Sequence, residues 1–128
     1  MKNAQPGDEI VVASGTYTAT DKFNFGNKAT RFGSDKNGTA SQPITVRAQN
    51  PSNPPILKGT NGDYDGYVMF ILGDYWILKD LILEEGSKGL VLDNANNGVI
   101  ENVVVRELGE EGIHLRDGSS NNLSLIHI

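Results

Sequence analysis

Short runs of apolar residues alternate with polar stretches along the whole chain. The apolar runs include residues 10–12 (IVV) and 77–83 (ILKDLIL), and Gly and Asn punctuate the sequence at short intervals. Runs of this length bounded by turn residues are typical of strands, and no i, i+3, i+4 apolar spacing continues long enough for a helix. The pattern therefore predicts an all-β chain of many short strands.

A repeat organises the second half of the chain. Residues 88–93 (KGLVLD) align with 111–116 (EGIHLR) at a spacing of 23 residues. Residues 77–83 align with 99–105 (VIENVVV) at a spacing of 22, and 68–73 (VMFILG) precede 89–94 by about the same step. A period of this size with short strands predicts a solenoid, and the signature and helical half of a leucine-rich repeat are absent. We expect one incomplete β-solenoid domain over residues 1–128, with about four to five coils of 22–23 residues.

Alternation within the repeated strands sorts their side chains into two sets. The inner set is Leu90, Leu92, Ile113 and Leu115, and the outer set is Val91, Asp93, His114 and Arg116. Stacking at the usual interstrand spacing of about 4.8 Å would place Asp93 beside Arg116 and Lys88 beside Glu111. Both pairs have opposite charges, which supports the alignment, although an exposed pair contributes only about 0.2–1 kcal/mol.

The two ends of the chain follow the repeat less closely. Strands are expected at 8–12, 43–48 and 56–58, and the polar, Gly-rich residues 22–39 are expected to form a long loop projecting from the first coil. Residues 123–128 (LSLIHI) match the translation of a transposase adapter used in sequencing libraries, so we expect a non-native tail there. A genuine apolar strand is the alternative. With Met1 directly ahead of what resembles an internal segment, we expect a gene fragment.

Charge and composition exclude several classes of protein. Eleven Lys and Arg against sixteen Asp and Glu give a net charge of −5 without a basic stripe, which argues against nucleic-acid binding. No apolar stretch approaches the roughly 18–20 residues that span a bilayer, so we expect no membrane partner. The absence of Cys excludes a disulfide scaffold and a thiolate metal site. No signal-peptide core opens the chain.

Four segments carry a family resemblance. Residues 6–18 (PGDEIVVASGTYT) and 38–60 resemble the opening coils of pectin-lyase-like right-handed parallel β-helix proteins, most of all lyases of the chondroitinase B and alginate lyase type. Residues 73–83 (GDYWILKDLIL) resemble the coil that follows, and residues 88–122 resemble a wider set of secreted β-helix proteins. The resemblance implies a right-handed parallel β-helix, secretion, and a monomer when the protein has its full length.

The resemblance also implies a reaction, β-elimination on an acidic polysaccharide. In such lyases a Lys or Arg takes the proton α to a uronate carboxyl, and Ca²⁺ often neutralises that carboxylate. The bases of those lyases lie on coils beyond the matched region, so no residue of this chain is identified as the base by motif. Fold and reaction separate in this superfamily.

Local chemistry suggests one candidate site. His114 and Arg116 share an outer face with Glu111 and Asp93, so Arg116 could hold a carboxylate while His114 or Glu111 moves a proton, and Asp93 with Arg116 could contact substrate. The simpler interpretation of the same four residues is a solvated ladder of cross-coil ion pairs. Stacking on sugar rings is one interpretation of Tyr64, Tyr67, Tyr75 and Trp76, but large aromatic residues at this density usually fill coil corners or the core.

A second candidate is a calcium loop. Asn61, Asp63 and Asp65 in NGDYDG match the first half of such a loop, but Leu72 stands at the twelfth position, where a helix–loop–helix site needs Glu. A looser Ca²⁺ site is one interpretation, and a turn in which Asn and Asp bond their own backbone is the other. The doublet at 84–85 resembles a glycosidase pair, but adjacent strand residues should point to opposite faces.

Three functions follow from these observations. The first is the N-terminal part of a secreted polysaccharide lyase, with this chain inactive by itself because both solenoid ends lack caps. The second is a noncatalytic carbohydrate-binding β-helix, and the third is a purely structural solenoid.

Overall fold

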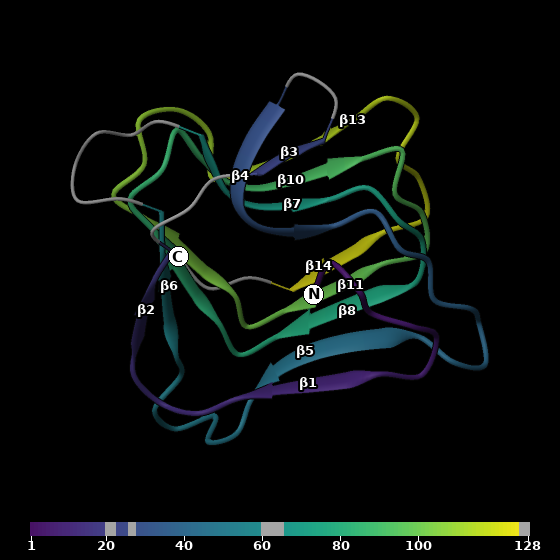
Figure 1. Ribbon diagram of the computed structural model, residues 1–128, viewed down its shortest axis with the longest axis horizontal. Helices are drawn as coiled ribbons and strands as arrows, with labels where there is room; N and C mark the ends of the chain where they lie inside the picture. The colour runs from purple at the N-terminus through teal and green to yellow at the C-terminus, as the bar shows by residue number, and fades with distance from the viewer. Residues whose placement is uncertain (20–22, 26–27, 60–65, 126–128) are drawn as a thin grey trace.

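Parallel strands wound into a β-helix make up the chain. The computed structural model describes residues 1–19, 23–25, 28–59 and 66–125, and their strands form three sheets (Figure 1). The first sheet contains β1 (Glu9–Val12), β5 (Ile44–Ala48), β8 (Trp76–Lys79), β11 (Val99–Glu101) and β14 (Leu123–Leu125). The second contains β3 (Phe23–Phe25), β4 (Lys28–Ser34), β7 (Tyr67–Ile71), β10 (Lys88–Asp93) and β13 (Ile113–Arg116). The third contains β2 (Thr16–Thr18), β6 (Ile56–Lys58), β9 (Ile82–Glu84) and β12 (Val104–Arg106).

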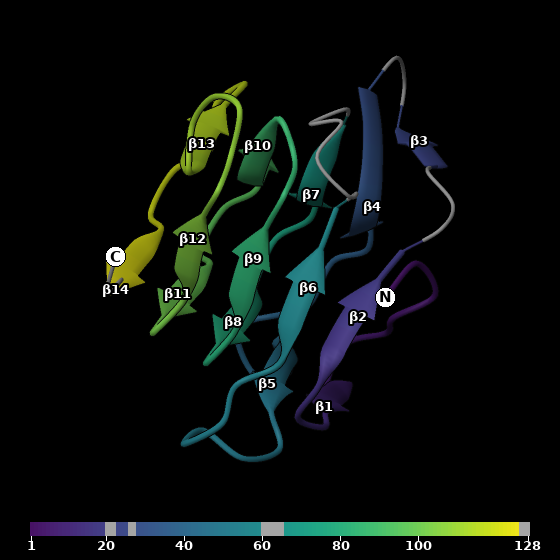
Figure 2. The same cartoon turned by 90° about the vertical axis from the view of Figure 1, so that its left-hand side faces the viewer.

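Each coil takes one strand from each sheet. The chain runs β4–β5–β6, then β7–β8–β9, then β10–β11–β12, with partial coils before and after, and Figure 2 shows the third sheet with these coils stacked side by side. The predicted right-handed parallel β-helix of about four to five coils is therefore confirmed. Among the described residues there is no helix long and apolar enough to cross a membrane.

The register agrees with the repeat alignment. Leu90 pairs with Ile113 and Asp93 with Arg116, as the 23-residue spacing predicts. Ile77 pairs with Val99 and Ile82 with Val104 across the 22-residue spacing. The repeat in the sequence is thus the physical coil.

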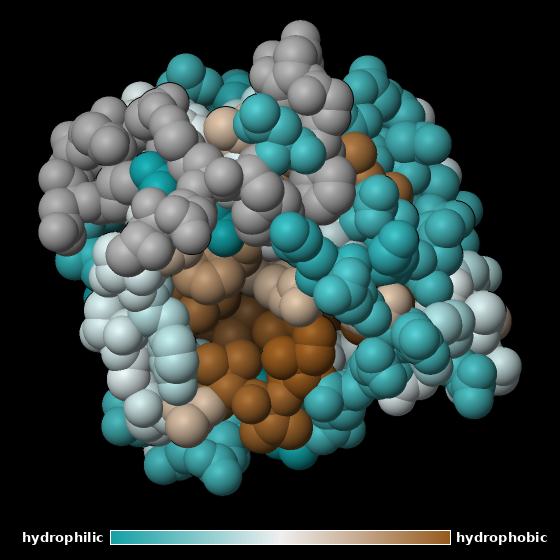
Figure 3. All heavy atoms as spheres, in the orientation of Figure 1, coloured by the Kyte–Doolittle hydropathy of each residue, from teal (hydrophilic) through white to brown (hydrophobic). Residues whose placement is uncertain are grey.

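The inward side chains form one continuous core. Leu90, Leu92 and Ile100 are almost completely buried because a coil lies on each side of them. Leu115, predicted to point inward, is 45% exposed because β13 is the last strand of its column in the described residues. At the other end, Met1, Ala4, Ile10 and Phe32 help to line an apolar hollow, visible in Figure 3. Burial therefore depends on the neighbouring coil as well as on residue type.

The coil corners use left-handed backbone at stacked positions. Residues with positive φ recur one coil apart, as the pairs Tyr75 and Asn97, Asp80 and Asn102, and Glu85 and Glu107. At Glu85, φ is 59°, which ends the strand, and both Glu84 and Glu85 reach Lys58, at 3.9 and 3.3 Å. The expectation that this doublet points to opposite faces is wrong, because the corner interrupts strand alternation.

The prediction of a projecting loop at 22–39 is wrong for residues 28–34. Within that range β4 is a stacked strand, in which Thr30 pairs with Tyr67 and Phe32 with Met69. Thr30 is fully buried and its hydroxyl donates to the Phe32 carbonyl oxygen at 2.8 Å, so this polar side chain is satisfied inside the sheet. Only β3 departs from the parallel stack, since it pairs antiparallel with β4. In the predicted tail, residues 123–125 form β14, which pairs with β11.

Candidate functional site

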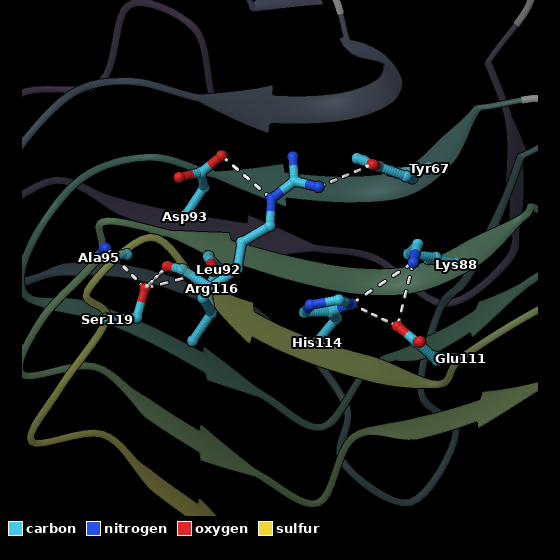
Figure 4. A network of polar contacts seen from close by, with 9 residues as sticks. All are labelled: Tyr67, Lys88, Leu92, Asp93, Ala95, Glu111, His114, Arg116 and Ser119. Atoms are coloured by element: carbon cyan, nitrogen blue, oxygen red, sulfur yellow. Dashed lines mark hydrogen bonds and ion pairs between the residues drawn. The ribbon is translucent and has the colours of Figure 1, made fainter.

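The outer face of the second sheet brings the predicted site residues together. Lys88 and Asp93 lie on β10, while His114 and Arg116 lie on β13 (Figure 4). Asp93 and Arg116 are register partners, as predicted, and Lys88 reaches Glu111 in the segment just before β13. We call this set, together with Tyr67 on β7, the outer-face cluster.

Arg116 is the most firmly held member of the outer-face cluster. Its Nε donates to Asp93 Oδ2 at 3.1 Å, and its Nη1 donates to the Tyr67 hydroxyl oxygen at 3.1 Å. The guanidinium carbon lies 5.5 Å from the centre of the Tyr67 ring and 5.3 Å from that of Phe70. Such cation–π contacts and a charged hydrogen bond restrict the side chain strongly. Within the described part of the chain, Nη2 makes no hydrogen bond.

An apolar layer supports this guanidinium. Tyr67, Phe70 and Val91 form a separate buried cluster on the outer side of the sheet. Val91 was expected to face outward, which its alternation with Leu90 and Leu92 supports, but it is fully buried beneath other side chains. The expectation that Tyr67 only packs misses its contact with Arg116. Tyr67 is in register with Lys88, at the opposite end of β10 from Asp93, so the alignment carried no signal for this contact.

Lys88 is the centre of a second group of charges. Its Nζ lies 3.0 Å from Glu111 and 3.2 Å from Glu110, and it lies 3.4 Å from His114 Nδ1. The hydrogen bond to Glu111 raises the pKa of Lys88 above its ordinary value, with burial opposing and Glu110 assisting. The contact with Lys88, and then that with His114, lowers the pKa of Glu111. The two carboxylates therefore hold Lys88 in its charged form.

His114 shares Glu111 with Lys88. Its Nδ1 is hydrogen-bonded to Glu111 Oε2, and in the described residues its Nε2 has no hydrogen-bond partner. A proton on Nδ1 that is donated to Glu111 would leave the lone pair on Nε2, which is the tautomer that a general base requires. The arrangement thus permits proton transfer at Nε2, whereas Glu111 is occupied by two donors.

The environment of Asp93 suits it to orient Arg116 and not to contact an anionic substrate. Burial raises the pKa of its carboxyl, and the nearby Asp117 carboxyl raises it further, against the lowering effect of Arg116. A buried carboxylate beside a second one repels anionic substrates. Asp93 therefore orients Arg116 through a hydrogen bond, and the Arg116 guanidinium is the group able to bind a substrate carboxylate.

The predicted calcium ligands Asn61, Asp63 and Asp65 lie outside the described residues. Of the residues that are described, Glu84, Glu85 and Glu107 can bring carboxylate oxygens within 4.8 Å of one another. Arg106 Nε lies 2.6 Å from Glu84 and Lys58 contacts two of these side chains, so the cluster already has cationic partners. These three carboxylates do not fit a Ca²⁺ site, because Ca²⁺ requires several oxygen ligands and Lys58 and Arg106 already occupy oxygens of this cluster.

Comparisons with known proteins agree with the fold. The alginate lyase from Paenibacillus sp. str. FPU-7 is 38% identical with a TM-score of 0.81, over 98% of this chain and 39% of that chain. Pectate lyase PEL9 of Emericella nidulans is 31% identical over 98% of this chain and 31% of the relative. Pectate lyase Pel9A has a TM-score of 0.71 at 25% identity, over 95% of this chain and 30% of that chain.

These relatives are all much longer than this chain, which spans less than a third of the curated relatives it matches, at 31% and 29% of their lengths. The family profile for the Pel9A-like right-handed β-helix region matches residues 1–127. The stacked register, the three parallel sheets and this match lead to one conclusion. The chain belongs to the Pel9A-like right-handed β-helix family.

Proposed function

We propose that this chain supplies the opening coils of a secreted, monomeric polysaccharide lyase that cleaves an acidic polysaccharide by β-elimination. The observation that carries the proposal is the Arg116 guanidinium, oriented on the outer face with Nη2 unengaged in the described structure. Similarity to an alginate lyase and to pectate lyases supports the same reaction class. An oriented cation on an open parallel sheet suits a chain of uronates.

The reaction requires three changes at one uronate. A base removes the proton α to the carboxyl, the bond from the β carbon to the glycosidic oxygen breaks, and that oxygen takes up a proton. A carbon–carbon double bond remains in the new non-reducing end. Arg116 would bind the carboxylate and so stabilise the negative charge that develops when the proton leaves.

His114 is the candidate in this chain for proton transfer, through Nε2. Glu111 orients its ring, while Asp93 holds Arg116. Because Lys88 and His114 both occupy Glu111, that carboxylate is a positioning group in the proposal and not the base.

The alternative function is a noncatalytic carbohydrate-binding or structural β-helix. The pairing of charges on this face favours it, since Lys88 contacts two carboxylates and Arg116 contacts Asp93. Such a ladder can stabilise the stack without binding anything.

An ultraviolet assay for unsaturated uronates distinguishes the two. The protein encoded by the complete reading frame is incubated with polygalacturonate, alginate and rhamnogalacturonan, and absorbance is followed. We expect product from one acidic polymer with the long protein and none with the 128-residue chain. Glycan binding without product would refute the lyase proposal in favour of the alternative, and turnover by the short chain would refute its expected inactivity.

A further inference from the structure

The hydroxyl of Tyr67 has a hydrogen-bonding capacity that its known contacts do not use. Its oxygen accepts from Arg116 Nη1 at 3.1 Å, which leaves the phenolic O–H free to donate. None of the described residues accepts a hydrogen bond from this hydroxyl. Two donors, the Tyr67 O–H and the Arg116 Nη2–H, therefore lie next to each other without acceptors in the described structure.

The charge arrangement around these donors is asymmetric. Asp93 contacts Arg116 through Nε, and on the edge that carries Nη1 and Nη2 the described residues place the neutral Tyr67 hydroxyl. That hydroxyl orients the edge without adding a second negative charge beside it. An incoming carboxylate at this edge could accept one hydrogen bond from Nη2 and one from the phenol, as paired donors favour.

The Tyr67 ring is fixed before any ligand arrives. It is only 7% exposed, and it packs edge-to-face on Phe70 with ring centres 5.3 Å apart and an interplanar angle of 83°. Its backbone carbonyl accepts from the Thr30 hydroxyl at 3.3 Å, which ties β7 to β4 at this position. A donor pair held in place in the free protein lowers the ordering cost of binding.

We propose that the Tyr67 hydroxyl and the Arg116 guanidinium form a two-donor site for the carboxylate of a uronic acid residue. The inference rests on the proposed function and adds Tyr67 to its carboxylate contact. Tyr67 binds one carboxylate oxygen and also positions Arg116 for the other. The site distinguishes a free uronate from its methyl ester, because the ester has neither the charge nor two equivalent acceptor oxygens.

Calorimetric titration of the 128-residue chain with trigalacturonate, and with its fully methyl-esterified form, tests the site. We expect binding of the acid and little binding of the ester. Tyr67→Phe should weaken acid binding about 3- to 10-fold, the effect of one hydrogen bond, and Arg116→Gln at least about 10-fold. Arg116→Lys, which keeps the charge without the planar fork, should fall between wild type and Arg116→Gln.

The matched control is Tyr17→Phe, which removes a phenol on another sheet whose hydroxyl donates to the Ala13 carbonyl oxygen at 2.8 Å. It should leave trigalacturonate binding unchanged. The positioning role is measured without ligand, as the ¹⁵N relaxation of Arg116 Nε. Tyr67→Phe should make that group more mobile, and Tyr17→Phe should not.

Each failure has a separate meaning. Equal binding of acid and ester, or no binding by the wild type, would overturn the carboxylate site. Wild-type affinity and rigid Arg116 in Tyr67→Phe would overturn the role of Tyr67 and leave Arg116 in place. Because no turnover is measured here, an absence of unsaturated product in the ultraviolet assay would refute the lyase proposal alone.

Discussion

The column of leucines at Leu92 and Leu115 offers a direct test of how stacking stabilises this protein. The two residues are register partners one coil apart, yet Leu92 is 3% exposed and Leu115 is 45% exposed. Residue type, sheet and orientation are the same, so the difference comes from the coil that covers Leu92. Truncating each to alanine compares a covered side chain with an uncovered one.

The expected magnitudes follow from burial. Leu92→Ala loses the transfer free energy of the removed atoms and leaves a cavity between two coils, which together cost about 3 kcal/mol. Leu115→Ala loses about half of the transfer term and leaves no enclosed cavity, so its cost is about 1 kcal/mol. The free energy of unfolding should therefore differ by about 2 kcal/mol between the two variants.

Urea unfolding followed by circular dichroism measures this difference, provided that the slope of the transition is unchanged. A larger shift in midpoint is expected for Leu92→Ala. Equal destabilisation by the two substitutions would refute the reasoning, because it would mean that the neighbouring coil adds nothing to the burial energy of this column.

Three further predictions concern other parts of the coil. Gly73→Ala should prevent stable folding, because a Cβ would lie 1.8 Å from the Lys36 carbonyl oxygen; the soluble yield and thermal midpoint report it. Lys88→Met should raise the pKa of Glu111 back towards its ordinary value, as followed by carboxyl ¹³C NMR. In the wild type the lowered pKa of Glu111 stabilises the fold above the ordinary pKa of the carboxyl, and this stabilisation is lost as pH falls through the folded pKa. Lys88→Met should therefore reduce the loss of stability in acid. Thr30→Val should cost about 1 kcal/mol in urea unfolding, through the lost hydrogen bond to a strand carbonyl, whereas no loss would contradict its role in β4.

The repeat made much of the fold predictable. Alternation predicts Leu90 and Leu92 in the core, and the 23-residue spacing predicts Asp93 beside Arg116, as the structure shows. Both inferences hold because each coil of a solenoid is one sequence repeat that stacks on the next. Two segments that align in the sequence are therefore two strands in contact. The same reasoning predicted that Lys88 would contact Glu111.

The N-terminal half was less predictable for a physical reason. Residues 28–34 are polar and Gly-containing, and their strand is formed because β7 supplies a parallel partner and the buried Thr30 hydroxyl finds a backbone acceptor. The doublet at Glu84 and Glu85 converges because a left-handed corner falls between strands, which alternation cannot anticipate. Local pattern misses both effects, since each depends on neighbouring segments.

Coil length, register and the inward face of the second half follow from its amino-acid sequence, because these features repeat along the chain. The partners of the outer-face side chains depend on the tertiary structure. It placed Tyr67 against Arg116, buried Val91 beneath them and added Glu110 to the contacts of Lys88. Side chains on an outer face have no periodic core to constrain them, so their partners depend on the reach of long side chains across two or three coils.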